Sequence, residues 1–319
     1  MGLLIDGKWS PKPVVTDARG RFVRAKTQFR RWIGTESDAD FRPQAGRYHL
    51  YVSYACPWAH RTLIMRALKG LEGAISLSVV DPFMGEQGWQ FSDNPGCLPD
   101  TVNGARYLSE VYVKANTHYT GRVTVPVLWD RQQETIVNNE SREIMRMFDT
   151  VFSGLATKPN EFCPASLVEE IDATIDALYE PVNNGVYRAG FARTQEAYEE
   201  AVAELFQALD HWERHLARQR YLCGRQLTEA DWCFFTTLLR FDMVYYTHFK
   251  CNLRRIVDYP NIWSYLRDLY QMPGVTATCN FAHIKEHYFR SHTSLNPRGI
   301  VPVGPLIDFR EPHDRDRFG

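Results

Sequence analysis

The chain has 319 residues, a length that corresponds to about two domains, each large enough to bury its own core. Lysine and arginine total 37 against 38 aspartate and glutamate residues, so the formal net charge is -1. No surplus of positive charge is therefore available for nucleic acid or for an anionic membrane. Hydrophobic residues make up 44% and charged residues 24%, which excludes a chain that is disordered throughout.

The sequence also indicates a soluble, cytoplasmic protein. No apolar run approaches the roughly 20 residues that a transmembrane helix needs. The N-terminal run MGLLIDGK carries charges where a signal peptide needs an apolar stretch. The seven cysteines are odd in number and no two are spaced C-x-x-C, which argues against a disulfide framework and a zinc ribbon. We expect no bound metal.

The first regular elements are predicted on both sides of a Cys-Pro pair. Residues 48–54 are rich in aromatic and β-branched side chains and predict a strand. Cys56-Pro57 follows, and because proline suits the first turn of a helix, a helix is expected over about 57–69. A second strand at 75–80 completes a βαβ unit, in which the two strands run parallel.

Residues 81–120 form a long irregular stretch with many prolines and glycines, and loops of this length inside a domain tend to be functional. A strand is then expected over 123–129. Because it contains Pro126, that proline must lie at an edge or at a special turn. A short strand at 135–137 and a helix from Ser141 follow.

Helical patterns dominate after about residue 160. Apolar residues spaced four and three apart over 197–217 predict an amphipathic helix, and Thr228 with Asp231 resembles a capping box that begins another. We therefore expect an α/β part followed by an all-α part. The expected divisions are an N-terminal extension at 1–46, an α/β domain at 47–155 with the insertion 81–120, an all-helical domain at 160–290, and a C-terminal arm at 291–319.

Cys56 is the strongest candidate for a catalytic residue. It precedes a helix N-terminus, where unpaired N–H groups and the positive end of the helix dipole favour a thiolate. His60 and Arg61 lie one turn further on and could assist. Ala59 stands where a C-x-x-C site has its second cysteine, so Cys56 can form a mixed disulfide only with an external thiol. The alternative, an inert core cysteine, fits less well with the strand and the proline around it.

Several short motifs follow one another in an ordered set: Cys56 to Arg61, Trp89 in the insertion, Arg122 to Pro126, Glu140-Ser141, and Thr228 to Asp231. This set resembles the glutathione transferases, in which a thioredoxin-like N-terminal domain precedes an all-helical C-terminal domain. More closely, the chain after about residue 40 resembles the glutathionyl-hydroquinone reductases, the Xi class of that superfamily. The resemblance implies a homodimer.

The resemblance further implies that glutathionyl-hydroquinones are the substrates and that glutathione is the co-substrate. Cys56 would attack the thioether sulfur, and a second glutathione would resolve the mixed disulfide to give oxidised glutathione. The departing ring carbon must gain a proton, so a general acid is required. The catalytic tyrosine of the family corresponds to Tyr187, and its two supporting tyrosines correspond to Tyr245 and Tyr288.

For glutathione binding, the residue types and the resemblance agree. Ser141 at a helix N-terminus can receive the γ-glutamyl carboxylate, and Glu140 the ammonium group. The backbone of Val125, held by a cis bond to Pro126, can pair with the cysteinyl part as a strand would. The remaining candidates are Val123 and Thr124, Arg122 for a second carboxylate of glutathione, and Trp89 as a side chain that covers the tripeptide. Alternatively, Arg122 would be an ordinary surface charge and Trp89 would only anchor its loop.

Three other functions stay open at this point. The run from His283 to His287 matches H-x-x-E-H, a zinc-peptidase pattern, but only 319 − 287 = 32 residues remain to supply a third ligand. A general glutathione-dependent thiol transferase would act on small disulfides or dehydroascorbate, and a binding protein of the same fold would lack catalysis. A flat, tyrosine-lined second pocket would favour hydroquinones, and an open, polar one would favour disulfides.

Overall fold

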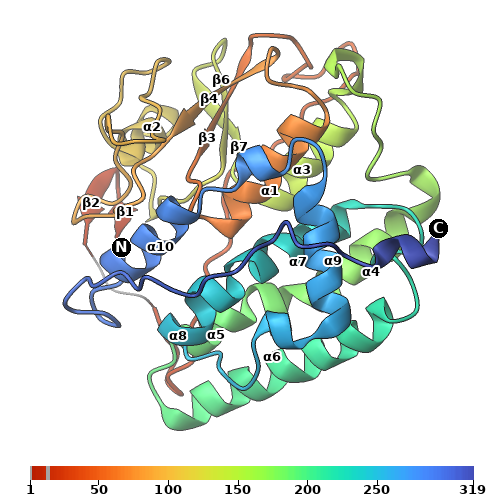
Figure 1. Cartoon of the computed structure of the whole chain (residues 1–319). Coiled ribbons are helices and arrows are strands. Elements are labelled where there is room, and N and C mark those ends of the chain that lie inside the picture. The colour runs from red at the N-terminus through yellow and green to blue at the C-terminus, as the bar shows by residue number, and fades with distance from the viewer. Residues whose placement is uncertain (1, 12–14) are drawn as a thin grey trace. The chain divides into compact units, whose positions relative to one another are not determined.

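The computed structural model describes residues 2–11 and 15–319, whose contacts group into two compact units (Figure 1). The first unit holds the residues up to 11, Ala25–Asn160 and Thr278–Ile300. The second holds the residues from 15 to Arg24, Glu161–Ala277 and Val301–Gly319. This grouping differs from the expected divisions, because residues 15–24 of the extension join the second unit and residues 278–290 join the first. The domain boundaries themselves stay a prediction.

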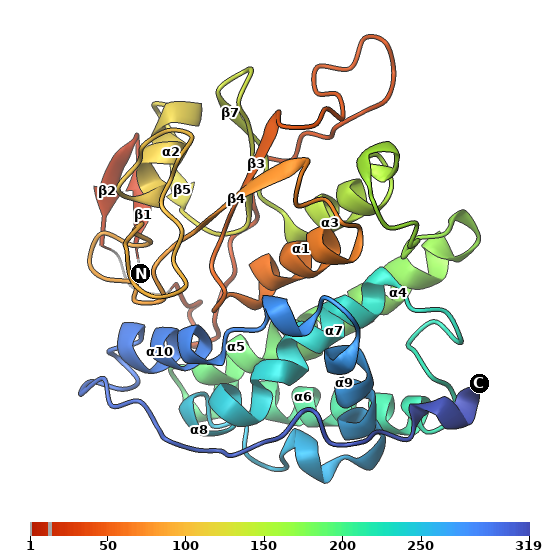
Figure 2. The same ribbon diagram turned by 45° about the horizontal axis from the view of Figure 1, so that its top comes forward.

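A four-stranded sheet forms the core of the first unit. In spatial order its strands are β4 (Ile75–Val79), β3 (Tyr48–Val52), β6 (Val127–Asp130) and β7 (Thr135–Asn138). β3 pairs in parallel with β4, so the βαβ unit is confirmed, and β6 is antiparallel to both of its neighbours. Figure 2 shows α1 (Pro57–Leu68) and α3 (Ser141–Asp149) packed together on one side of this sheet.

The strand expected over 123–129 is corrected by the structure, since β6 begins only at Val127. The bond between Val125 and Pro126 is cis, as expected. Pro126 has no N–H to donate to a ladder, so the segment before it runs outside the sheet.

Two elements of the first unit were missed in the sequence. A small sheet is formed by β2 (Lys8–Ser10), β1 (Leu3–Ile5) and β5 (Gly121–Arg122), and the helix α2 (Leu108–Ala115) lies within the insertion. The hairpin of β1 and β2 could have been predicted, because Asp-Gly is a preferred two-residue turn between strands. Here the turn residues Asp6 and Gly7 both have positive φ, 47° and 71°.

The second unit is helical. Its helices are α4 (Val168–Leu178), α5 (Gly185–Gly190), α6 (Gln195–Leu216), α7 (Glu229–Arg240), α8 (Tyr246–His248) and α9 (Pro260–Gln271). The helix predicted over 197–217 is thereby confirmed as α6. Two π-helical turns, Tyr179–Asn183 and Phe241–Tyr245, interrupt the run of α-helices. Within the two described ranges, no helix has the length and apolarity to cross a bilayer.

The capping box at the start of α7 is confirmed, and it extends into a buried network. The Asp231 carboxylate accepts the N–H of Thr228 at 2.8 Å, the N–H of Leu222 at 2.9 Å and the hydroxyl of Tyr265 at 2.9 Å. Burial raises the pKa of Asp231 to about 6, against the lowering effect of these donors. One side chain therefore fixes a helix start, the loop before it and α9.

Asp231→Ala should destabilise the second unit strongly, because at least three buried donors lose their acceptor at about 1–3 kcal/mol each. A loss of at least about 3 kcal/mol should lower the thermal midpoint by roughly 6–12 °C, followed by circular dichroism at 222 nm. Asp210→Ala removes a half-buried carboxylate paired with Arg254 and serves as the control. Equal shifts in the two variants would contradict the role given to Asp231.

Candidate active site

Cys56 lies between the end of β3 and the first residue of α1, as the sequence predicted. It is the N-cap residue, its carbonyl accepts the N–H of His60 at 3.0 Å, and Pro57 is the first helical residue. The half-buried thiol donates to the carbonyl oxygen of Val125 at 3.6 Å. The N-terminus of α1, which favours a thiolate, thus stands directly beside the backbone expected to pair with glutathione.

The segment before the cis bond is held by a tyrosine that sequence reasoning missed. The Tyr112 hydroxyl donates to the carbonyl of Thr124 at 2.8 Å. The N–H of Thr124 in turn donates to the hydroxyl oxygen of Tyr112 at 3.3 Å. The side-chain amide of Asn139 donates to this hydroxyl at 3.0 Å. Burial raises the pKa of Tyr112, so its hydroxyl keeps the proton it donates. The spacing of the apolar residues at 108, 111 and 112 could have predicted α2, the helix that carries Tyr112.

Glu140 and Ser141 stand at the N-terminus of α3. Glu140 is the N-cap residue, and its carboxylate accepts the N–H of Arg142 at 3.4 Å and the hydroxyl of Thr27 at 3.3 Å. Ser141 is buried, and its Oγ accepts from Arg61 Nη1 at 3.4 Å. Arg61 therefore links α1 to the start of α3, and it also lies 4.5 Å from the ring of Trp58. A helix N-terminus with these groups suits a carboxylate ligand.

The two less specific candidates have different surroundings. Arg122 lies in β5 opposite Leu3, half-buried, and its carbonyl accepts the hydroxyl of Tyr119 at 3.0 Å. Val123, which follows it, is buried. Trp89 is 6% exposed and stacks on the ring of His287, with centroids 4.8 Å apart and planes inclined at 20°.

The three candidate tyrosines fall in both units. Tyr187 on α5 and Tyr245 at the end of a π-helical turn belong to the second unit, with ring centroids 6.0 Å apart. Tyr288 is buried on α10 (Phe281–Ser291) of the first unit. π-helical turns are frequent at functional sites, and each of the first two tyrosines follows or ends one.

Arg24 is a further residue near Tyr187 that the sequence did not indicate. Its guanidinium lies 4.8 Å from the ring centroid of Tyr187, and its Nε donates to the side-chain oxygen of Asn184 at 2.8 Å. The residue comes from the expected N-terminal extension, and no local pattern marks it. A positive charge at this place would stabilise negative charge developing on the tyrosine oxygen.

The histidines of the H-x-x-E-H run contact backbone carbonyls. His283 Nε2 donates to the carbonyl of Pro95 at 2.7 Å, and His287 Nδ1 donates to that of Pro82 at 2.8 Å. Glu286 pairs with Arg290. Among the residues that the structure describes, no cluster of three or more His, Cys, Asp or Glu side chains is arranged to hold a metal ion. The run therefore has a structural explanation.

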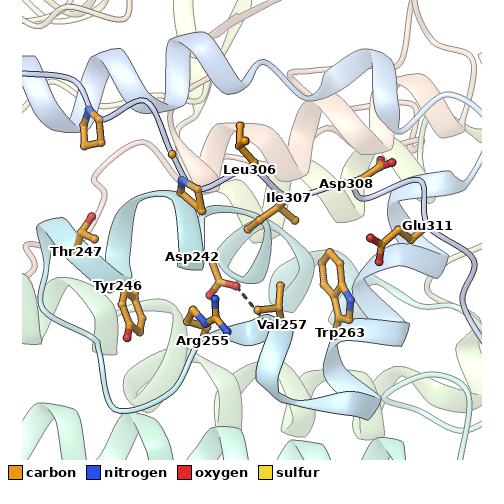
Figure 3. Close-up of a pocket in the computed structure, with 13 residues that line it drawn as sticks. Asp242, Tyr246, Thr247, Arg255, Val257, Trp263, Leu306, Ile307, Asp308 and Glu311 are labelled. Carbon is orange, nitrogen blue, oxygen red and sulfur yellow. Dashed lines mark hydrogen bonds between the residues drawn. The ribbon is translucent and has the colours of Figure 1, made fainter.

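A cavity of about 450 Å³ lies in the second unit, under the segment from Pro302 to Asp308 (Figure 3). Trp263, Val257 and Ile307 form apolar walls, and the Asp242 carboxylate at its floor accepts the N–H of Val257 at 3.1 Å. The described residues that line this cavity include none of the candidates from the sequence.

Two family models match the chain. The glutathione S-transferase N-terminal domain matches residues 55–151, and the C-terminal domain of the same family matches residues 195–268. These matches cover the segments that hold Cys56 and the capping box of α7.

Relatives match over nearly the full length. The chain is 53% identical to the glutathionyl-hydroquinone reductase YqjG of Escherichia coli, covering 100% of both chains, and 53% identical to the reductase PcpF of Sphingobium chlorophenolicum, covering 96% of both. Among solved structures, a Xi class glutathione transferase from Natrialba magadii has a TM-score of 0.95 at 55% identity, covering 99% of this chain and 98% of that one.

The glutathione-bound structure of YqjG has a TM-score of 0.91 at 52% identity and covers 99% of each chain. The sheet with its βαβ unit, the helical second unit and these relatives agree. The chain belongs to the glutathionyl-hydroquinone reductases, the Xi class of the glutathione transferase superfamily.

Proposed function

We propose that this protein reduces S-glutathionyl-hydroquinones to hydroquinones, with glutathione as co-substrate. The observation that carries the proposal is the Cys56 thiol at the N-terminus of α1, 3.6 Å from the carbonyl of Val125. It stands in a chain that is 53% identical over its full length to a glutathionyl-hydroquinone reductase. A thiolate at this position attacks sulfur rather than merely activating a bound thiol.

The reaction proceeds in two balanced steps. The Cys56 thiolate attacks the thioether sulfur of the substrate, an S–S bond forms, and the ring carbon takes the electron pair of the broken C–S bond together with a proton. A second glutathione thiolate then attacks the Cys56–glutathione disulfide and releases oxidised glutathione. Ala59 leaves no internal thiol at the fourth position, so the second thiol comes from solution.

For the tripeptide, we assign binding roles to the groups around Cys56. The start of α3, with Ser141 and Glu140, receives the γ-glutamyl carboxylate and ammonium groups. The backbone of Val125 pairs with the cysteinyl part, supported by Thr124 and Val123. Arg122 and Trp89 contact the remainder of the tripeptide.

For the proton, we assign the donor to Tyr187. A positioned tyrosine hydroxyl can serve as a general acid. The guanidinium of Arg24, 4.8 Å from the ring centroid, supports the charge that develops when the proton leaves. In this proposal Tyr245 and Tyr288 supply the two supporting hydroxyl groups.

We further propose a homodimer located in the cytoplasm. Reduced glutathione is consumed in the second step, so the reaction requires a reducing compartment. The homodimer follows from the resemblance alone.

Cys56→Ser should abolish hydroquinone release, because a serine hydroxyl cannot form the mixed disulfide, while glutathione should still bind. Turnover is measured as hydroquinone release by chromatography, and glutathione binding by calorimetry. Cys97→Ser, which changes a second half-buried cysteine of the first unit, should retain activity. Substantial turnover in the Cys56 variant would refute the assignment.

Tyr187→Phe should slow hydroquinone release by about 10²–10⁴-fold, the usual contribution of a positioned acid. Reduction of a small mixed disulfide should change much less, because a sulfur leaving group needs little protonation. Both substrates are assayed on the same variant. Tyr198→Phe, which removes a hydroxyl bonded to the carbonyl of Lys250, is the control. Equal losses on both substrates would show that Tyr187 supports Cys56 or glutathione instead.

Light scattering at micromolar concentration should give twice the chain mass of 37.0 kDa, 2 × 37.0 = 74.0 kDa. A monomeric mass under these conditions would contradict the homodimer and leave the reductase proposal untouched.

A further inference from the structure

The helix α10 contacts the start of the insertion through three side chains of its last turns. His287 Nδ1 donates to the carbonyl of Pro82 at 2.8 Å, and Ser291 Oγ accepts the N–H of Met84 at 2.9 Å. The guanidinium of Arg290 lies 5.0 Å from the ring centroid of Phe83. The helix and the insertion, 207 residues apart in sequence at the contact between Met84 and Ser291, can be followed side by side in Figure 2.

The same helix contacts the insertion a second time through its first turn. His283 Nε2 donates to the carbonyl of Pro95 at 2.7 Å. Gly96 follows with φ +87°, and a Cβ there would stand only 2.9 Å from His283 Nε2. The close approach and the positive φ both require glycine. The stretch 82–96 is therefore tied to α10 at both ends.

Trp89 lies between these two attachment points. Its indole stacks on the ring of His287 at 4.8 Å, and its carbonyl accepts the N–H of Leu108 at 2.9 Å. His287 therefore holds the loop backbone with one ring nitrogen and the indole with its face. Asp81 braces the loop internally, because its carboxylate accepts from Ser92 and Asn94 at 2.6 Å each.

We infer that His287 is a positioning residue for glutathione: through Pro82 and Trp89 it holds the insertion in the conformation that receives the tripeptide. This inference rests on the proposed function, in which Trp89 contacts glutathione. A binding wall that is ordered in advance avoids the ordering cost at the moment of binding, so loosening it lowers affinity. The chemical step at Cys56 involves none of these contacts.

The two roles of the ring can be removed separately. A carbonyl only accepts, so Nδ1 of His287 carries the proton in this bond. His287→Asn keeps a donor near that position and loses the ring face. His287→Phe keeps the ring face and loses the donor, and His287→Ala loses both. His211→Ala is the matched control, since it removes an exposed histidine whose ring contacts Trp212 at 5.0 Å in the second unit.

Calorimetric titration with reduced glutathione and steady-state kinetics on the full chain test the inference. His287→Ala should raise the Kd and the KM for glutathione about tenfold or more, with kcat at saturation nearly unchanged. His287→Asn and His287→Phe should each recover part of the affinity, and His211→Ala should match the unmodified protein. Amide hydrogen exchange over 83–92 should speed up most in the alanine variant, less in the asparagine and phenylalanine variants, and not in His211→Ala.

A double-mutant cycle identifies the route of the effect. In a Trp89→Ala background, His287→Ala should weaken glutathione binding little further, because the wall it positions is already missing. Unchanged Kd and KM in all three His287 variants would overturn the inference, and so would a lower thermal midpoint with intact affinity. If the unmodified chain failed to reduce glutathionyl-hydroquinones but His287→Ala still weakened glutathione binding, only the proposed function would fall.

Discussion

The candidate site of the first unit is built around one contact, between the Cys56 thiol and the carbonyl of Val125 at 3.6 Å. Two chain segments 69 residues apart meet there. One is the turn that leads from β3 into α1, and the other is the segment that ends at the cis bond to Pro126. The helix dipole favours the thiolate, and the backbone of Val125 stands beside the sulfur. A peptide thiol aligned on that backbone would have its sulfur next to Cys56.

A short network of hydrogen bonds, in addition to the sheet, joins the groups around this contact. Asn139, next to the start of α3, donates to Tyr112, which donates in turn to Thr124. Arg61 connects α1 to Ser141. The helix N-terminus that suits a carboxylate and the backbone that suits a cysteinyl group are thus held at a fixed spacing, which is what recognition of one extended peptide requires.

Sequence reasoning reached Cys56, the βαβ unit and the start of α3 because each depends on neighbours within a few residues. It singled out Tyr187, Tyr245 and Tyr288 among 16 tyrosines only through family resemblance, since nothing local distinguishes them. Tyr112 and Arg24 act through contacts with distant segments, which a single sequence does not reveal. The H-x-x-E-H run shows the reverse, a local pattern that misleads. The same spacing of histidines can bind a metal or contact two loop carbonyls, and the sequence alone does not distinguish the two.

The two π-helical turns have a consequence for how this site could change in evolution. In the first turn the N–H of Asn184 donates to the carbonyl of Tyr179 at 2.7 Å, and in the second the N–H of Tyr246 donates to Phe241, so each turn holds one residue more than an α-helical turn. One residue rotates everything after it by about 100° around a helix axis. A single-codon deletion in either turn would therefore leave the helices continuous while pointing the neighbouring tyrosine in another direction, so that a lineage keeps the fold and displaces a candidate site residue in one step.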